Sequence, residues 1–165
     1  MQLGILSDIH DNIWSLGRVL DHLATCDQLL CLGDLCSPFT VAQIEQAFEG
    51  PLHFVWGNND GDREHIARKL VHRGNAKLHG EFAELELEGV RLAMTHYPHL
   101  ANALAAGQQY DLVCHGHDHQ RQQRLEGRTL VVNPGEVMGR FGVVSYAIYD
   151  TGPRTASLIE LGSPR

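Results

Sequence analysis

Acidic and histidine side chains follow short apolar runs at two points near the start of the chain. Asp8-Ile9-His10 comes after the apolar residues 3–6, and Gly33-Asp34 comes after residues 29–32. In extended chain, residues two apart point to the same side, so Asp8 and His10 can chelate one cation. The two carboxylate oxygens of Asp34 can bridge a pair of cations. Either motif alone is also a common turn, so neither establishes a metal centre by itself.

Three further polar segments follow later apolar runs. They are Gly57-Asn58-Asn59-Asp60, Thr95-His96 and His115-Gly116-His117-Asp118-His119. The first can be a polar turn that caps a helix beginning near Gly61, or a loop that turns the Asn58 side-chain oxygen toward a metal. The histidine triplet alone can be a solvated loop. In open α/β sheets, ligands bind beyond the carboxyl ends of strands, where all five segments are expected to lie.

Together the five segments offer imidazole nitrogens with carboxylate and amide oxygens. Such a mixed set suits Mn, Fe, Zn, Co or Ni better than Ca, and it does not choose among them. Two bound divalent ions would add four positive charges at one place, which makes a phosphate-bearing substrate compatible with the net charge of −7.

In this order, the DxH, GD, GNxD, strand-end His and GHxH motifs resemble those of the calcineurin-like metallophosphoesterase family. The match extends from Asp8 to His119. Downstream, Asn133-Pro134-Gly135-Glu136 followed by Arg140 resembles the NPGS-and-Arg segment of the small bacterial and archaeal branch, whose members are often phosphodiesterases. Each motif is weak alone, but five in fixed order are specific.

The resemblance implies a ligand set and a reaction. One metal ion is expected on Asp8, His10 and His119, a second on Asn58, His96 and His117, with Asp34 bridging the two. It implies two divalent ions, Mn in first place and Fe, Zn, Co or Ni as alternatives. The implied reaction is hydrolysis of a phosphate ester, with a phosphodiester as the expected substrate. The attacking group is a hydroxide that bridges ions about 3.5–4 Å apart.

The chain departs from the family pattern at the third motif, which is commonly GNHD. Asn59 stands in place of that histidine, so it cannot act as a general acid, although it can contact substrate. Because such help is typically worth 10²–10⁴-fold, His99 and His115 are considered as alternative acids. Arg140 can reach a substrate phosphate or be an ordinary surface arginine. Asp60, Asp118 and Asn133 are expected to orient ligands.

Hydrophobic patterns predict the elements that position these segments. Strands at residues 3–6, 29–32 and 52–56 each precede an amphipathic helix, an alternation that favours a parallel sheet. The buried faces of the first and third helices are expected to include Ile13 and Val71.

The second half of the chain has a different pattern. It predicts hairpins at residues 82–95 and 123–132, a helix at 100–106, a strand at 110–114, and closing strands near 143–149 and 155–161. We therefore expect an α/β fold with two packed β-sheets flanked by helices, as a single domain over residues 1–165.

Composition limits the partners and the compartment. A net charge of −7 argues against a stable nucleic-acid partner, which requires clustered Lys and Arg. The chain shows no signal-peptide pattern and no apolar stretch long enough for a bilayer, so we expect a cytoplasmic protein without membrane contact. The cysteines are expected to be reduced. A homo-oligomer is compatible with the sequence.

Two other functions stay open at this point. The retromer scaffold subunit resembles this fold and serves as an interaction surface, so a non-catalytic scaffold is one alternative. A phosphomonoesterase is the other, because a metal centre treats all phosphoryl groups alike. The complete set of donors favours an enzyme over the scaffold.

Overall fold

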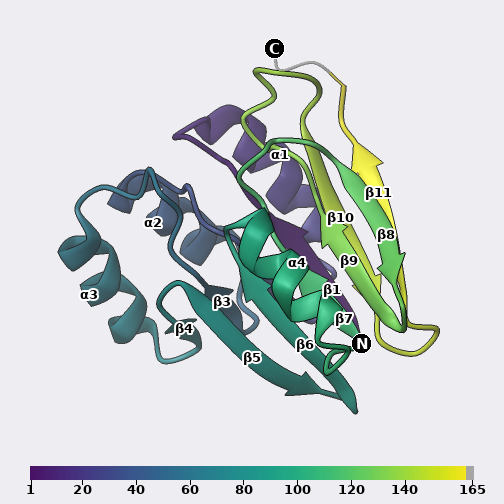
Figure 1. Cartoon of the computed structure of the whole chain (residues 1–165). Helices are drawn as coiled ribbons and strands as arrows, with labels where there is room; N and C mark the ends of the chain where they lie inside the picture. The colour runs from purple at the N-terminus through teal and green to yellow at the C-terminus, as the bar shows by residue number, and fades with distance from the viewer. Residues whose placement is uncertain (163–165) are drawn as a thin grey trace.

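The computed structural model describes residues 1–162, so residues 163–165 of the expected domain lie outside the described residues. The described chain forms four layers, in which two β-sheets pack face to face and helices cover both outer faces (Figure 1). The predicted α/β architecture with two sheets is confirmed.

The first sheet has a parallel centre. Its strand order is β11-β10-β1-β2-β3-β4, and β1 to β4 are parallel. β10 pairs antiparallel with β1, and β11 pairs antiparallel with β10. The bounds are β1 Gln2–Leu6, β2 Gln28–Cys31, β3 Leu52–Phe54, β4 Ala76–Leu78, β10 Ser145–Asp150 and β11 Thr155–Glu160. Strand alternation turns Leu3 and Ile5 toward the second sheet and Leu6 toward the helices.

Three helices cover the outer face of this sheet: α1 Ile13–Leu23, α2 Pro38–Ala47 and α3 Arg63–Arg73. Leu16, Ile44 and Ile66, one from each helix, are fully buried against it. The expectation that Ile13 and Val71 are buried is wrong, since they are 41% and 77% exposed. Val71 directly follows the buried Leu70, and one residue turns a helix by about 100°, which carries Val71 to the solvent side.

The second sheet has the order β5-β6-β7-β9-β8. Its strands are β5 Phe82–Leu87, β6 Val90–Thr95, β7 Leu112–Cys114, β8 Gln122–Glu126 and β9 Thr129–Asn133. β6, β7 and β9 are parallel, and the predicted hairpins supply the antiparallel edges β5 and β8. Helix α4, Pro98–Ala106, covers the outer face through Ala101 and Ala105.

Two local features differ from the sequence-based expectations. Strand β4 was not predicted, because Ala76-Lys77-Leu78 is too short and polar to show alternation. Helix α3 begins at Arg63, and its N-terminal cap is Asp62, whose side chain accepts from the backbone N of His65. The turn at residues 57–60 is therefore not the cap. Within residues 1–162, none of the helices combines the length and apolar character that crossing a bilayer requires.

Candidate metal centre

Loops after β1, β2, β3, β6 and β7 meet at one end of the two sheets. The backbone N atoms of Ile9 and His10 both donate to the carbonyl oxygen of Asp34 at 3.0 Å, which joins the first two loops. The backbone N of Gly116 donates to the carbonyl of His96 at 3.1 Å, which joins the last two. These bonds explain how residues distant in sequence come to share one site.

The backbone is strained where the expected ligands lie. Left-handed φ angles occur at five of them: Asp8 (53°), His10 (45°), Asp34 (54°), His117 (77°) and His119 (60°). Asp and His tolerate this region better than most residues, but it still costs free energy. Such strain persists only where the surrounding structure enforces it, and it concentrates at functional sites.

Two glycines allow the loops to approach one another. A Cβ atom on Gly57 would lie 2.1 Å from Asp34 Oδ1 and 2.4 Å from the Asp34 backbone N. A Cβ on Gly116 would lie 1.9 Å from Ser7 Oγ and 2.6 Å from Asp8 Oδ2. These residues are glycine because no side chain fits between the loops.

The first group of donors consists of Asp8, His10 and His119, which we call half-site one. His119 Nε2 lies 3.5 Å from Asp8 Oδ1, and His10 Nε2 lies 3.9 Å from the same oxygen. The ligand atoms of the three residues all lie within 4.8 Å of one another. This is the trio that the resemblance assigned to one metal ion.

The second group consists of Asn58, His96 and His117, which we call half-site two. Asn58 Oδ1 lies 3.0 Å from His96 Nε2 and 2.8 Å from His117 Nδ1. His96 Nδ1 donates to the carbonyl oxygen of Leu32 at 2.8 Å. A neutral imidazole with its proton on Nδ1 has a lone pair on Nε2, so two acceptors face each other across this half-site.

Asp34 lies between the half-sites. Its Oδ2 atom is 3.3 Å from His10 Nε2 and 3.5 Å from His96 Nε2. Asp8, Asp34 and His96 form a second group whose ligand atoms lie within 4.8 Å. One carboxylate oxygen therefore faces both half-sites, which is the geometry expected of a bridging ligand.

The residues fit a pair of cations. Among residues 1–162, Asp8 Oδ1 and His10 Nε2 are buried without a hydrogen-bond partner, which is costly for polar atoms. Both atoms face half-site one, and a cation there satisfies them together. In half-site two, a cation would likewise satisfy the two facing acceptors Asn58 Oδ1 and His96 Nε2.

Electrostatic coupling is strong in half-site one. Burial acts to raise the pKa of Asp8, but the electrostatic interactions with His10 and His96 outweigh it and hold that pKa below its usual value. The Asp8 carboxylate, with a smaller contribution from the Cys36 thiol, raises the pKa of His10 to about 10. The site therefore attracts positive charge, as a cation site must.

Several residues hold the loops from outside. Asp60 accepts from the backbone N atoms of Leu35 (2.7 Å), Cys36 (3.0 Å) and Gly57 (2.7 Å), and so ties the loop after β2 to the loop after β3. The Asn133 side-chain amide donates to Asp118 Oδ1 at 2.6 Å. Asp60, Asp118 and Asn133 thus hold the ligand loops, as expected of orienting residues.

Sequence reasoning named Glu136 only as part of the Asn133-Pro134-Gly135-Glu136 segment and gave it no role beside the donors. Glu136 is buried, and its Oε2 lies 2.7 Å from Nδ1 of His119. The available signal was an acidic residue between the apolar pair Val131-Val132 and Val137, a position where an unpaired carboxylate is costly.

The other predicted residues lie in different surroundings. The Asn59 backbone N and side-chain amide both donate to Asp34, each at 2.8 Å. The exposed His99 ring contacts Tyr97, whose own ring contacts His117. Arg140 is exposed, with its guanidinium 5.8 Å from the Phe141 ring centroid.

His115 is a buried predicted residue beside the site. Its Nδ1 lies 3.0 Å from the carbonyl oxygen of Gly116, and the side chain is buried. Burial lowers the pKa of His115, and the Gly116 carbonyl offsets part of this effect. His115 is therefore not one of the donors of either half-site.

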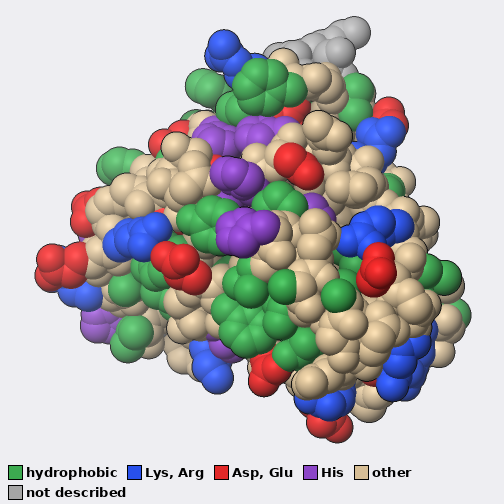
Figure 2. All heavy atoms as spheres, in the orientation of Figure 1, with side chains coloured by type: hydrophobic (Ala, Val, Ile, Leu, Met, Phe, Trp, Pro, Cys, Tyr) green, Lys and Arg blue, Asp and Glu red, His purple; other side chains and the backbone are tan. Residues whose placement is uncertain are grey.

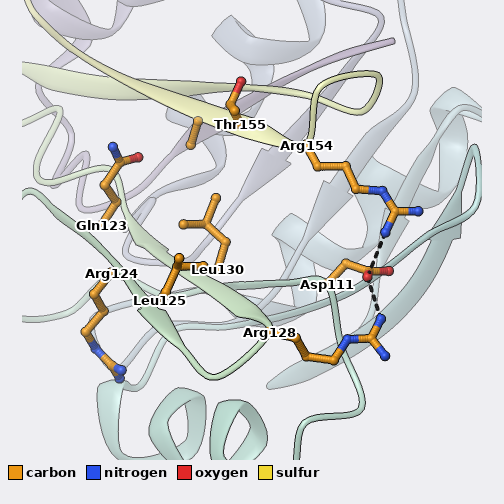
Figure 3. A pocket seen from close by; sticks show the side chains of 9 residues that line it. Asp111, Gln123, Arg124, Leu125, Arg128, Leu130, Arg154 and Thr155 are labelled. Carbon is orange, nitrogen blue, oxygen red and sulfur yellow. Dashed lines mark hydrogen bonds and ion pairs between the residues drawn. The ribbon is translucent and has the colours of Figure 1, made fainter.

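Histidine side chains gather on the upper part of one face, among hydrophobic and acidic side chains (Figure 2). A pocket of about 630 Å³ lies elsewhere, between β8 and β11, and none of the expected ligands lines it (Figure 3). Its Arg128 and Arg154 both pair with Asp111 Oδ1, at 2.8 and 2.9 Å. These cations are already partnered, so the pocket is neither a metal site nor an evident anion site.

Comparisons with known proteins agree with this geometry. The model of the calcineurin-like phosphoesterase superfamily domain matches residues 1–153. The phosphodiesterase MJ0936 of Methanocaldococcus jannaschii is 29% identical over 157 residues, which cover 92% of this chain and 93% of that protein.

Solved structures give the same result. The structure of an archaeal phosphodiesterase superposes with a TM-score of 0.91 at 26% identity, covering 98% of this chain and 100% of that one. The phosphoesterase YfcE of E. coli, at 21% identity, shares the fold with a TM-score of 0.69 over 98% of this chain and 100% of its own. The predicted small prokaryotic branch is thereby confirmed. The chain belongs to the calcineurin-like phosphoesterase superfamily, a metal-dependent family, and is a hydrolase of phosphate esters.

Proposed function

We propose that this phosphoesterase is a phosphodiesterase that works with two divalent metal ions, one in each half-site. The observation that carries the proposal is the arrangement of six donors in two groups of three around a seventh, Asp34, whose Oδ2 atom faces both groups. The buried atoms Asp8 Oδ1 and His10 Nε2, which lack partners among the described residues, support it independently. The likeness to a phosphodiesterase, found both by sequence and by structure, supports the choice of a diester.

Half-site one would hold its ion through Asp8, His10 and His119, and half-site two through Asn58, His96 and His117. The mixed oxygen and nitrogen donors suit Mn first, with Fe, Zn, Co or Ni as alternatives. When bound, a pair of divalent ions lowers the pKa of water and neutralises charge on phosphoryl oxygens, which activates water for attack on phosphorus.

The protein's own contribution is positioning. Asp34, buried and held by two hydrogen bonds from Asn59, sets the separation of the half-sites. The Leu32 carbonyl fixes the His96 ring so that Nε2 faces Asn58. Asn58 and His117 are exposed and leave half-site two open to solvent, which gives a substrate phosphate an approach. Asn59, which donates to Asp34, is one proposed substrate contact. Arg140, which lies over the ring of Phe141, whose edge in turn meets His119, is the other.

The experiment is hydrolysis of bis-p-nitrophenyl phosphate and p-nitrophenyl phosphate by EDTA-treated protein, with each divalent metal added back. The proposal expects turnover that requires metal, is highest with Mn, and favours the diester. Preference for the monoester would establish the phosphomonoesterase alternative. Absence of turnover with every metal, in protein that retains its fold, would favour the scaffold.

A further inference from the structure

Glu136 connects the last ligand loop to the segment that follows β9. It lies three residues beyond the end of β9 and is only 1% exposed. Its Oε2 lies 2.7 Å from His119 Nδ1, and its Oε1 accepts from the backbone N of Phe141 at 2.6 Å. The following residues bind the first ligand loop, since the backbone N of Met138 donates to the carbonyl of Asp8 at 2.9 Å.

The contact with His119 decides which ring nitrogen can bind a cation. A carboxylate only accepts hydrogen bonds, so the Nδ1 atom that faces Glu136 must carry the proton. In a neutral imidazole this leaves the lone pair on Nε2, the atom that faces Asp8 Oδ1 at 3.5 Å. A hydrogen-bonded carboxylate behind the ring also makes the ligand nitrogen more basic.

The two half-sites differ in what lies behind their histidines. The His96 ring is held by a neutral backbone carbonyl, that of Leu32. The His119 ring is held by a buried side-chain carboxylate. A side chain can be replaced without moving the backbone, so this contribution can be isolated experimentally.

The same carboxylate fixes the loop that carries Arg140 and Phe141. The Phe141 ring meets the His119 ring edge to face, with centroids 5.2 Å apart at 83°. Phe141 is nevertheless 71% exposed, so apolar burial does little to hold it in place. The hydrogen bond from its backbone N to Glu136 ties this loop to the carboxylate that holds His119.

We propose that Glu136 is a positioning residue of the metal centre: it holds His119 in the tautomer whose Nε2 faces half-site one, and it fixes the Arg140–Phe141 loop against that ligand. The inference rests on the proposed function insofar as half-site one binds a cation. The tautomer itself belongs to the metal-free chain and can be measured without metal.

The first experiment is ¹H–¹⁵N NMR of the histidine rings in metal-free protein at alkaline pH, with signals assigned by single histidine substitutions. His119 of the wild type is expected with its proton on Nδ1. Glu136→Ala removes both acceptors and should shift the proton to Nε2, the form that an unconstrained imidazole favours. Glu160→Gln, a change at an exposed carboxylate that pairs with Arg121, should leave His119 unchanged. A wild-type His119 with its proton on Nε2 would overturn the proposal.

Glu136→Gln guards against a folding defect in the alanine variant. An amide has one acceptor oxygen, so it can serve either His119 or Phe141 but cannot serve both as a carboxylate does. Its effect on the tautomer should therefore be intermediate, with far-UV circular dichroism as in the wild type. A wild-type tautomer signal in both Glu136 variants would contradict a positioning role.

The second experiment measures Mn²⁺ affinity by calorimetry in an Asn58→Ala background, which weakens half-site two and isolates half-site one. Glu136→Ala should lower the affinity about 10–100-fold, with a smaller loss for Glu136→Gln. Equal Mn²⁺ affinity with Glu, Ala and Gln at position 136 in this background would refute the inference. If the wild type binds no Mn²⁺, the proposed function fails, whereas the tautomer measurement still decides the role of Glu136.

Discussion

Two pairs of histidines in this protein have nearly the same distance between their facing ring nitrogens, although the rings of the first pair are T-shaped and those of the second are stacked. In the metal centre, His117 Nδ1 lies 3.2 Å from His96 Nε2. At the β3–β4 edge of the first sheet, His53 Nδ1 lies 3.0 Å from His79 Nε2, with the rings stacked. The nitrogens of the second pair are slightly closer together, yet the charges around the two pairs differ.

The difference lies in the neighbours. His96 faces Asp34 and Asn58. In the neighbouring half-site one, the Asp8 carboxylate raises the pKa of His10 to about 10. The second pair contacts the neutral Gln28, while burial, the partner ring and the charge of Lys77 lower the pKa of His79 to about 4. In this protein the neighbouring charges, and not the distance between the rings, therefore distinguish the two histidine pairs.

The largest expected effect comes from removing the shared carboxylate. Asp34→Asn keeps the shape of the side chain but removes the anionic charge that the two half-sites share, and it leaves His96 and His117 without the carboxylate that faces them. We expect metal-dependent hydrolysis to fall by more than about 100-fold, because loss of a ligand exceeds the 10–100-fold cost of losing a supporting residue. Bis-p-nitrophenyl phosphate turnover and metal content by elemental analysis check this.

The matched control is Asp21→Asn, an exposed carboxylate on α1. It should retain wild-type turnover and metal content. An Asp34→Asn protein with full metal content and activity would show that the carboxylate does not distinguish the two histidine pairs.

A histidine beside the centre is tested next. If His99 protonates the leaving group, His99→Ala should slow alkyl esters about 100-fold while nitrophenyl esters, which need no acid, change little. His115→Ala is the comparison, since His115 is buried and its Nδ1 is engaged with Gly116. Equal slowing of alkyl and nitrophenyl esters by His99→Ala would exclude an acid role.

Close packing of the ligand loops gives a third test. Gly57→Ala places a methyl group 2.4 Å from the Asp34 backbone N, which cannot move as a flexible side chain can. We expect a loss of about 1–3 kcal/mol in the free energy of unfolding, together with weaker metal binding. Urea denaturation and calorimetry measure the two quantities.

Gly17→Ala provides the reference for this change. Gly17 lies in α1, and its nearest contact to an added Cβ is an ordinary 3.4 Å. Alanine there should stabilise by about 0.5–1 kcal/mol, since it favours helix more than glycine does. Equal effects of the two alanines would mean that the loops are not tightly packed.

The smallest effect concerns the second pair and pH. Because the folded-state pKa of His79 lies below its usual 6.5, the unfolded chain binds protons first, and stability is lost as pH falls from 6.5 toward about 4. His10 behaves oppositely: its stabilising contribution is complete below pH 6.5 and is lost as pH rises toward about 10. The two regions therefore act in separate pH ranges.

Urea midpoints of the metal-free protein across this range test the assignment. His79→Gln should flatten the acid dependence and leave Mn²⁺ binding at neutral pH unchanged. His10→Gln should change the alkaline dependence only. A loss of Mn²⁺ binding in His79→Gln would remove the distinction between the two pairs.

Most of the fold could be predicted because its patterns are local. Within residues 1–162, hydrophobic periodicity located the strands and helices except β4, a three-residue edge strand without alternation. Val71 shows the limit of this approach, since a side chain one residue beyond a buried position looks apolar in sequence but lies 77% exposed. Which face a helix buries depends on what packs against it.

The amino-acid sequence by itself determined the family and the inventory of donors, because motif order and residue type need no three-dimensional information. Only the tertiary structure decided that Asp34 faces both half-sites, that Glu136 supports His119, and that His53 and His79 pair without carboxylates. The physical reason is that these relations depend on distances between loops. Those distances are fixed by the register of strands and by backbone bonds between residues far apart in the chain.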